Sequence, residues 1–400
     1  MREGIPGSLL LALDQGGSSS RAIAFDVRGE VVASASVRVA EQRFGDDRVE
    51  QDPEELVGSL RTAAAACAQK LGGAGKISAA GLATQRSSVV CWDRATGAAL
   101  SPVLSWQDRR AAAWLEGFSE HADAIHRETG LFLSAHYGAS KLRWCLDNLE
   151  PVRHAREYGR LAIGPLASFL AFRLLDEHPF VADPANASRT LLWSIRTRDF
   201  DPALLTLFGI PRETLPECVP TRGDIGRIEI GGASVPFRVL TGDQSAAVFA
   251  FGSPRADTAY FNVGTGAFVQ RPCEPAPEPL PRLLASLAFD DGNSATYVVE
   301  GTINGAGSAV RAVADELGLG DVEGELESFL RTAAEPPLFL NGISGLAAPF
   351  WIPDFESRFV GEGAPHEKIV AVLESVVFLV RAILEEMESA LPAPNRIQAS

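Results

Sequence analysis

The stretch that decides the fold is SLLLALDQGGSSSRAIAFDVRGEVV, residues 8–32. An apolar run ends in Asp14, a turn of glycines and serines follows at once, and apolar alternation resumes after Arg21. The turn contains no G-x-x-x-x-G-K-[ST] sequence and does not open a helix, so it matches neither of two common nucleotide-binding loops. The pattern predicts a strand, a tight turn and a second strand.

Two interpretations of this turn are open from the residues alone. Gly-Gly and Ser-Ser are ordinary hairpin residues, and an aspartate at a strand end is a common cap. Alternatively, the backbone N–H groups of the two glycines and the hydroxyls of residues 18–20 form a cradle for phosphate. In the second case Asp14 faces the phosphates through a divalent cation, Mg²⁺.

Length, composition and charge limit the classes of protein to consider. The chain has 400 residues, 46% hydrophobic and 22% charged, as in globular proteins of two or three domains. Its 51 acidic and 36 basic side chains give a net charge of −15, which argues against nucleic acid or an anionic membrane as a partner. Five scattered cysteines without a CxxC spacing predict reduced thiols and a cytoplasmic location. No apolar run approaches the roughly 20 residues of a membrane span.

The hydrophobic pattern predicts strands mixed with helices along the whole chain. Strands are predicted at residues 77–84, 89–92, 103–106, 225–230, 236–240, 259–263 and 267–270. Asp52 is predicted to cap a helix that runs through residues 56–71. A long helix over 367–390 has a middle, 376–380, that is apolar on all sides and is therefore expected to be buried.

Residues 259–270 repeat the sequence pattern of the first hairpin. An apolar strand is followed by the turn Gly264-Thr265-Gly266 and a second strand. Two such hairpins predict a duplicated architecture with a cleft between its halves. N–H groups from both turns would then hold one polyphosphate. Nucleotide binding would close a hinge between the halves.

A series of motifs resembles those of the FGGY carbohydrate kinases, and among them the glycerol kinases, in the family's order. The matching motifs are Asp14-Gln-Gly-Gly-Ser-Ser-Ser-Arg21, Val49-Glu-Gln-Asp-Pro53, Gln85-Arg86, Ser105-Trp-Gln-Asp-Arg-Arg110, Asn186-Ala-Ser-Arg-Thr190, Gly242-Asp-Gln244, Gly264-Thr-Gly-Ala-Phe268 and Gly345-Leu-Ala-Ala-Pro-Phe-Trp351. Each motif alone is weak evidence for the family. Their occurrence in the family's order, at family-like spacing, is strong evidence for the resemblance.

The resemblance implies an α/β fold of two ribonuclease-H-like domains, the superfold of actin, hexokinase and the Hsp70 ATPase, with a nucleotide and substrate cleft between them. Residues 1–240 would form the N-terminal domain, with the phosphate hairpin and much of the polyol pocket. Residues 241–400 would form the C-terminal domain, with the catalytic aspartate and the second phosphate turn, ending before the family's adenosine-binding segment. The implied reaction transfers the γ-phosphoryl of ATP, with Mg²⁺, to a primary hydroxyl of glycerol or a similar small polyol or sugar.

The resemblance also implies roles for individual residues. Asp243 is the implied general base, kept ionised by the helix N-terminus on which it lies, and Asp14 is the implied metal ligand. The implied substrate-binding residues are Arg86, Ser87, Trp106, His136, Asp243, Gln244 and Phe268. The implied nucleotide-binding residues are Gly17, Ser18, Ser19, Arg21, Thr265, Gly266, Gly307 and Arg311.

Structural roles stay open for several of these residues. Asp243 could be a helix N-cap, Arg86 could form a surface ion pair, and Trp106 and Phe268 could simply pack in the core. Glycerol kinases usually carry Glu where this chain has Ser87 and Tyr where it has His136. A site built for particular hydroxyls rejects mismatched substrates strongly, so another small polyol or a ketose is an alternative to glycerol. The alternative function is a nucleotide-gated or catalytically dead protein of the same superfold, acting as a binding or scaffold module.

Overall fold

The computed structural model describes residues 8–400, which divide into two compact units. Unit 1 holds the described residues up to Ala247 together with Ser286–Thr296, and unit 2 holds Val248–Ala285 and Tyr297–Ser400. Asp243 therefore packs in unit 1. The predicted boundary of the family domains between residues 240 and 241 stays a prediction.

Unit 1 is an α/β unit with two main sheets. Its strands are β1 (Leu9–Gln15), β2 (Ser19–Phe25), β3 (Val31–Arg38), β4 (Gln42–Phe44), β5 (Arg48–Gln51), β6 (Ile77–Thr84), β7 (Val89–Asp93), β8 (Val103–Leu104), β9 (Leu161–Pro165), β10 (Val181–Ala182), β11 (Trp193–Ser194), β12 (Asp199–Phe200), β13 (Glu217–Cys218), β14 (Arg222–Ile230) and β15 (Ala233–Gly242). Its α-helices are α1 (Pro53–Lys70), α2 (Ala112–Leu115), α3 (Ala122–Thr129), α4 (Gly138–Asn148), α5 (Glu150–Glu157), α6 (Leu166–Leu174), α7 (Pro184–Ala187), α8 (Pro202–Phe208) and α9 (Asp243–Ala247). Short 3-10 helices are η1 (Ala74–Lys76), η2 (Glu116–His121), η3 (Ser188–Thr190) and η4 (Arg212–Thr214).

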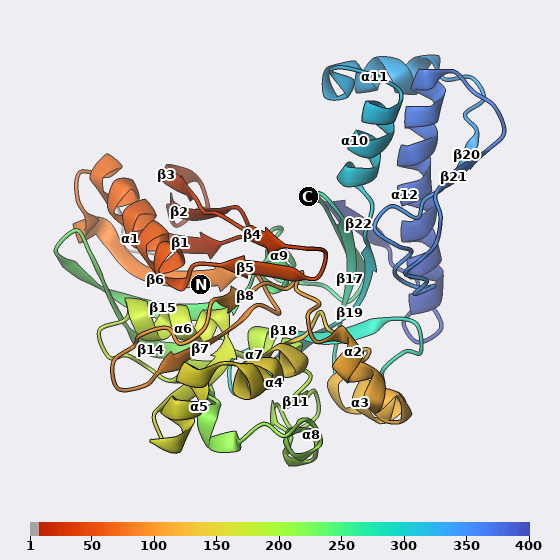
Figure 1. Cartoon of the computed structure of the whole chain (residues 1–400). Helices are drawn as coiled ribbons and strands as arrows, with labels where there is room; N and C mark the ends of the chain where they lie inside the picture. Colours follow the sequence, from red (N-terminus) through yellow and green to blue (C-terminus); the bar gives the residue numbers. More distant parts are fainter. Residues whose placement is uncertain (1–7) are drawn as a thin grey trace. The chain divides into compact units, whose positions relative to one another are not determined.

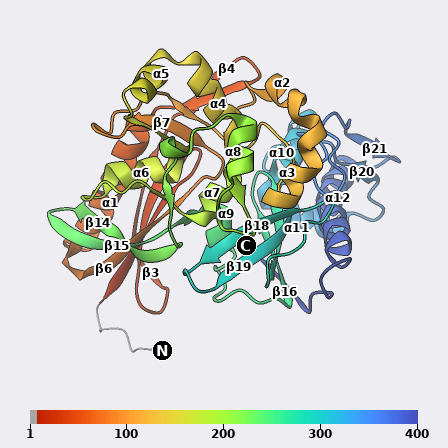
Figure 2. The ribbon, with the colours of Figure 1, turned by 90° about the horizontal axis from the view of Figure 1, so that it is seen from below.

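The first sheet of unit 1 has the order β14-β15-β6-β1-β2-β3. Strands β1, β2 and β3 are antiparallel, and β6 runs parallel to both β1 and β15. The β14–β15 hairpin forms one edge, which Figure 2 shows from below. This sheet confirms the hairpin predicted from residues 8–32, and it brings the ends of β1, β6 and β15 to neighbouring positions.

Helix α1 covers β1, β2 and β3 (Figure 1). Its start follows the sequence prediction, because the Asp52 side chain accepts hydrogen bonds from the backbone N–H groups of Glu54 and Glu55 at 2.8 and 3.4 Å. Its apolar face is buried, with Leu56 and Leu60 fully inside. Burial of this face stabilises the hairpin and holds it against the rest of the sheet.

The second sheet of unit 1 has the order β4-β5-β8-β7-β9. Its strand β7 places Trp92 in the core that both main sheets and helices α1 and α6 share. The Trp92 ring lies 5.7 Å from the Phe169 ring and 6.1 Å from the Phe172 ring, both carried by α6. Aromatic contacts of this kind fix the second sheet against the first.

Unit 2 repeats the topology of the first sheet. Its elements are β16 (Thr258–Val263), β17 (Ala267–Cys273), β18 (Leu284–Asp290), β19 (Ala295–Ile303), β20 (Leu338–Leu340), β21 (Arg358–Val360), β22 (Arg396–Ala399), α10 (Gly307–Glu316), α11 (Val322–Thr332) and α12 (Pro365–Met387). Most of β18 and the start of β19, within Ser286–Thr296, are assigned to unit 1. The sheet order is β18-β19-β17-β16-β22, with β16, β17 and β19 antiparallel and β22 parallel to β16. The set β6-β1-β2-β3 of unit 1 has the same directions, so the predicted duplication is confirmed at the level of topology.

Helix α12 packs beside α10, α11 and β20 (Figure 1). Val372 is fully buried on this face, and Ile383 is fully buried against Gly301 of β19. Val377 and Phe378 are 61% and 52% exposed. The expectation that the middle of this helix is buried all round is therefore wrong for these two residues, because the helix contacts its neighbours through one face. No helix within residues 8–400 is both long enough and apolar enough to cross a membrane.

Candidate functional site

The glycine-serine turn joins β1 to β2 at one end of the first sheet. The N–H of Gly16 donates to the carbonyl of Ser19 at 3.0 Å, and Ser18 at the tip is exposed. Asp14 and Arg21 are directly opposite each other in the ladder, and Arg21 Nη2 lies 2.6 Å from Asp14 Oδ2. The predicted phosphate and metal residues of this turn are thus together at one strand end.

Asp14 is the candidate metal ligand. Within residues 8–400, no three His, Cys, Asp or Glu side chains gather into a metal site. Protein-bound Mg²⁺ commonly takes only one or two carboxylates and fills its shell with phosphate oxygens and water. Asp14 lies near enough to Asp243 to raise the pKa of that carboxyl. The donor set therefore fits a Mg²⁺ that arrives with a polyphosphate.

Asp243 and Arg86 come together because they follow parallel strands. Gly242 at the end of β15 pairs with Thr84 at the end of β6, so α9 begins beside the segment after β6. Arg86 Nε lies 3.9 Å from Asp243 Oδ1, and the two side chains are 7% and 35% exposed. Gly242 permits this approach, since a Cβ there would lie 2.5 Å from Arg86 Cγ.

The charge state of Asp243 reflects two opposing influences. Burial raises its pKa, and the nearby charge of Asp14 raises it further. Arg86, the N–H of Gln244 and Arg189 lower it. The N–H of Gln244 donates to Asp243 Oδ1 at 2.7 Å, as the helix position leads one to expect. The net pKa is raised, so burial outweighs the helix N-terminus that was expected to dominate.

Trp106 and His136 form an aromatic wall in unit 1. Their ring centroids are 5.6 Å apart, and the His136 ring lies 4.9 Å from that of Tyr137. Lys141, which is 1% exposed, donates from Nζ to the carbonyls of His136 and Ser87 at 2.7 and 2.9 Å. This lysine ties the predicted substrate residues after β6 to those before α4.

His136 is surrounded by positive charge. Burial lowers its pKa well below the usual value, and Lys141, Arg109, Arg189 and Arg86 lower it further. The imidazole is therefore neutral at physiological pH and can both donate and accept a hydrogen bond.

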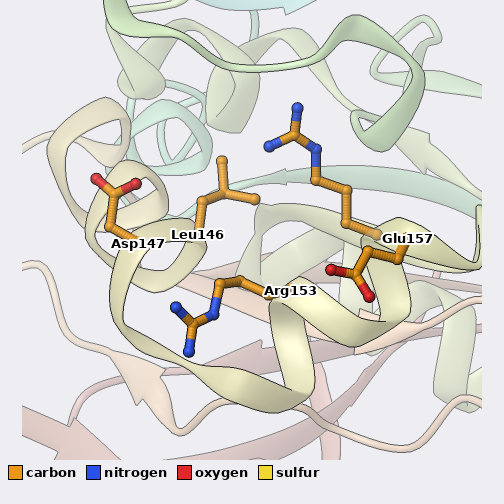
Figure 3. Close-up of a pocket in the computed structure, with 5 residues that line it drawn as sticks. Leu146, Asp147, Arg153 and Glu157 are labelled. Atoms are coloured by element: carbon orange, nitrogen blue, oxygen red, sulfur yellow. The ribbon is translucent and has the colours of Figure 1, made fainter.

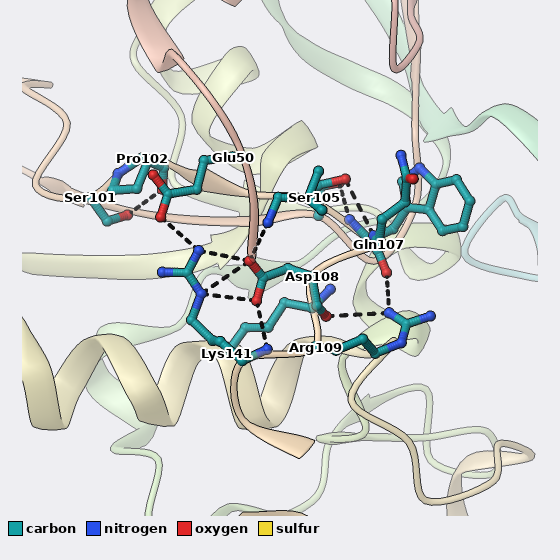
Figure 4. Close-up of polar contacts among 12 residues, drawn as sticks. Glu50, Ser101, Pro102, Ser105, Gln107, Asp108, Arg109 and Lys141 are labelled. Carbon is teal, nitrogen blue, oxygen red and sulfur yellow. Dashed lines mark hydrogen bonds and ion pairs between the residues drawn. The ribbon is translucent and has the colours of Figure 1, made fainter. Parts of the chain in front are cut away.

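A buried ion-pair network supports the loop that carries Trp106. Asp108 accepts from Arg110 Nη2 at 2.7 Å and from the N–H of Val49 at 2.8 Å (Figure 4). Arg110 Nη2 also donates to Glu50 Oε1 at 2.6 Å. The network thus joins β5 to the segment after β8.

Two buried side-chain oxygens, each on the residue that follows Arg86 or Asp243 in sequence, have no hydrogen-bond partner within the described chain. They are Ser87 Oγ and Gln244 Oε1. Buried polar atoms in folded proteins are nearly always paired, so these two oxygens indicate a missing polar ligand. Oxygen atoms that await donors fit a ligand rich in hydroxyls.

Two further functional candidates lie here: Arg189, to which the sequence analysis gave no role, and Tyr137, which could substitute in part for the tyrosine that His136 replaces. Arg189 is 3% exposed, and burial followed by the nearby charge of Arg86 lowers its pKa to about 9. Tyr137 is buried, which raises its pKa. Arg189 lay within a matching motif and carried no role, while Tyr137 adjoins the predicted His136. Their nearness to Arg86 arises only from packing.

In unit 2 the predicted turn is fastened to the start of α10. The carbonyl of Thr265 accepts from the N–H groups of Ala306 and Ser308 at 3.1 and 3.0 Å. The N–H of Gly307 donates to the Gly264 carbonyl at 3.0 Å, and a Cβ on Gly307 would lie 2.7 Å from that oxygen. Thr265, Gly266 and Gly307 are therefore together, with Phe268 following on β17 and Arg311 exposed on α10.

A pocket of about 450 Å³ between α4 and α5 of unit 1 is separate from these residues (Figure 3). It is lined by Leu146, Asp147, Arg153, Arg156 and Glu157. Its acidic and basic side chains balance, and it contains none of the predicted site residues.

Two family models match almost the whole chain. The N-terminal domain of the FGGY family of carbohydrate kinases matches residues 9–250, and the C-terminal domain of that family matches residues 259–400. A glycerol kinase of Delftia acidovorans is 36% identical over 389 residues, which cover 94% of this chain and 78% of the relative. A glycerol kinase of Thermus brockianus is 36% identical over 396 residues, covering 95% and 79%.

Solved structures agree on the fold. The glycerol kinase of Plasmodium falciparum, determined with ADP, matches with a TM-score of 0.90 at 23% identity and covers 98% of this chain and 81% of that one. The xylulose kinase of Rhodospirillum rubrum matches with a TM-score of 0.85 at 21% identity, again covering 98% and 81%. The predicted α/β superfold is confirmed. With both domain models matched in order, the chain belongs to the FGGY family of carbohydrate kinases.

Proposed function

We propose that this protein transfers the γ-phosphoryl group of ATP, with Mg²⁺, to a primary hydroxyl of glycerol or a similar small polyol, with Asp243 as general base. The observation that carries the assignment of Asp243 is its carboxylate, 3.9 Å from the buried Arg86 at the ends of two parallel strands. The glycerol kinases at 36% identity support the substrate class.

In this mechanism Asp243 accepts the proton of the attacking hydroxyl, and its raised pKa favours that transfer over a fully solvated carboxylate. Arg86 and Gln244 hold other hydroxyls of the substrate. The unpartnered Gln244 Oε1 supports this role, since a substrate hydroxyl would supply its missing donor. Trp106 offers an apolar face to the carbon chain.

The turn between β1 and β2 would hold the phosphates, with Asp14 directed at their metal ion. A Mg²⁺ ion held by Asp14 and the phosphates would supply positive charge to neutralise the charge that develops on the transferred group. Arg21 forms an ion pair with Asp14, which supports a role for its guanidinium in contacting the same phosphates. In unit 2, the residues Thr265, Gly266, Gly307 and Arg311 would contribute the second phosphate turn and nucleotide contacts, and Phe268 the other apolar wall.

Ser87 and His136 would set the choice among polyols. The Ser87 hydroxyl is buried without a partner in the described chain, and the His136 ring is neutral. Both groups hydrogen-bond without charge, which suits a neutral hydroxyl-bearing substrate. The alternative of a nucleotide-gated or catalytically dead protein is not favoured by the family match. We also propose a cytoplasmic location, supported by five cysteines that are all free thiols.

The test is a panel of small polyols and ketoses, each with ATP and Mg²⁺, in a coupled assay for ADP. The proposal expects one or more three- to five-carbon polyols to release ADP in proportion to phosphorylated product. Release of ADP without a phosphorylated polyol, or no release with any compound while MgADP binds, would contradict it.

A further inference from the structure

Two buried glutamines lie behind the β1–β2 turn and have no role in the proposal above. Gln51 and Gln85 are 1% and 3% exposed. Gln85 Nε2 donates to Gln51 Oε1 at 2.6 Å, and Gln51 Nε2 donates to the carbonyl of Gly17 at 2.9 Å. Gln51 ends β5 in the second sheet, and Gln85 follows β6 in the first. The two side chains therefore form a relay from both sheets to the turn.

This relay fixes the direction of one peptide group. In a planar trans peptide the C=O and the following N–H point in opposite directions. The carbonyl of Gly17 points at the buried amide of Gln51, so the N–H of Ser18 must point away from the interior. Ser18 is exposed, in agreement with that direction.

A second contact acts on the preceding peptide in the same way. Gln15 Nε2 donates to the carbonyl of Gly16 at 2.7 Å, which turns the N–H of Gly17 away from the Gln15 amide. Gln15 is itself fully buried and accepts from Ser20 Oγ at 3.4 Å. Among residues 8–400, neither the Gly17 nor the Ser18 N–H donates to a backbone carbonyl. Both donors are thus left for a ligand.

The glycines make such a device necessary. Glycine has more backbone freedom than other residues, so the peptide groups that follow Gly16 and Gly17 can turn at less cost and point their carbonyls outward instead. An outward carbonyl would repel phosphate. Gln51 donates to the Gly17 carbonyl and accepts from the buried Gln85 amide. These two hydrogen bonds favour the orientation of the turn that binds phosphate.

We propose that Gln51 and Gln85 are positioning residues for the nucleotide, holding the Gly17–Ser18 peptide with its N–H toward the phosphates. The inference rests on the proposed function for the identity of the ligand as ATP. It assigns to these glutamines no contact with the nucleotide or with the polyol.

The test compares two substitutions at Gln51 that remove the donor in different ways. Gln51→Glu keeps the oxygen that accepts from Gln85 and replaces only the N–H that reaches Gly17. Gln51→Met removes the polar group and keeps the length of the side chain. The control is Gln69→Glu, which adds the same charge on an exposed position of α1. Dissociation constants for MgADP, and KM values for MgATP and for the polyol, are measured from pH 6 to pH 8.5, with thermal melting of each variant.

At pH 8 both Gln51 variants should weaken MgADP binding and raise the KM for MgATP on the order of tenfold or more, with the KM for the polyol within about twofold of wild type. In Gln51→Glu alone the loss should recede toward pH 6, because a protonated carboxyl again donates to the Gly17 carbonyl. A purely structural role would not produce that pH dependence. Gln69→Glu should match wild type.

Unchanged MgADP binding in both Gln51 variants, or equal losses for nucleotide and polyol, would overturn the proposal. Should Gln51→Met fail to fold, the pH dependence of Gln51→Glu decides alone. A wild-type protein that binds MgADP and phosphorylates no polyol would refute the proposed function, while the binding data on the variants would still decide the role of the relay. A wild-type protein that binds no MgADP would refute both.

Discussion

Arg86 Nε lies 3.9 Å from Asp243 Oδ1, although the residues are far apart in sequence and follow different strands. The pairing of β6 with β15 makes this possible, and Gly242 leaves room for the arginine stem. The arginine favours the ionised carboxylate and burial opposes it, with burial the larger influence on the pKa of Asp243. The site therefore holds a carboxylate that is more basic than one in water and is fixed in position.

Asp243→Asn should lower kcat by about 10²- to 10⁴-fold, because the amide cannot accept the hydroxyl proton. The polyol should still bind within a few-fold of wild type, since Arg86 and Gln244 remain. Single-turnover kinetics and direct polyol binding measure the two effects separately. Retained turnover would remove Asp243 from the mechanism.

The same substitution should change stability in a pH-dependent way. The pKa of Asp243 is raised in the folded chain, so the stability that this group contributes is complete below its unfolded pKa of about 3.9 and is lost as pH rises through the folded pKa. Asn carries no charge and avoids that loss. Urea unfolding should therefore find that the stability of Asp243→Asn relative to wild type increases from pH 4 to pH 7. A relative stability that stays flat or falls over this range would contradict the raised pKa.

Gly242→Ala should disturb the site through Arg86. The new Cβ would lie 2.5 Å from Arg86 Cγ and 2.6 Å from its Cδ, so the arginine stem must move. We expect a rise in KM for the polyol of about tenfold, corresponding to the loss of one hydrogen bond from a charged donor. Gly58→Ala is the matched control, because a Cβ there meets nothing within 4 Å and should leave kinetics unchanged. Similar kinetic losses in both variants would show that the effect is not specific to Arg86.

Local pattern was sufficient for those parts of the fold whose determinants lie close together in sequence. The strand at residues 77–84 and the helix cap at Asp52 were predicted at their observed positions, because alternation and capping involve neighbours only. The turn of residues 16–18 was also predicted, since glycine and serine are typical of tight turns between strands. Contacts such as that between Gln51 and Gly17, which are 34 residues apart, depend on packing that no local pattern encodes.

The errors have the same origin. The apolar run in α12 shows that the side chains are hydrophobic, but it does not show which of them other elements cover. The exposure of Phe378 was therefore not predicted. Arg189 lay in a matching motif, yet only the fold places its guanidinium near Asp243. The raised pKa of Asp243 was likewise missed, because the helix N-terminus is visible in the sequence and burial is not.

Asp108→Ala should destabilise the protein strongly. The side chains of Asp108 and Arg110 are 0% and 2% exposed. Removal of Asp108 takes away one of the two carboxylates that pair with Arg110 and leaves Glu50, which is 20% exposed, as the remaining partner (Figure 4). Breaking a buried pair of this kind costs about 3–5 kcal/mol of unfolding free energy. Arg381→Ala is the control, since Arg381 and Glu385 are 78% and 59% exposed and such pairs contribute at most about 1 kcal/mol. Equal losses in urea unfolding would contradict the importance assigned to burial.

His136→Gln should change the acid side of the stability profile. Burial and four nearby cationic side chains lower the pKa of His136 well below its usual value, so the folded chain holds a neutral ring that the unfolded chain protonates near pH 6.5. The stability this residue contributes is present above pH 6.5 and is lost as pH falls toward the folded pKa, at about 1.4 kcal/mol per pH unit for one proton. Glutamine does not titrate, so the unfolding free energy of wild type minus that of the variant should fall between pH 6.5 and pH 5. A difference that stays flat over this range, measured by urea unfolding at constant ionic strength, would mean that His136 titrates in the folded protein as it does in water.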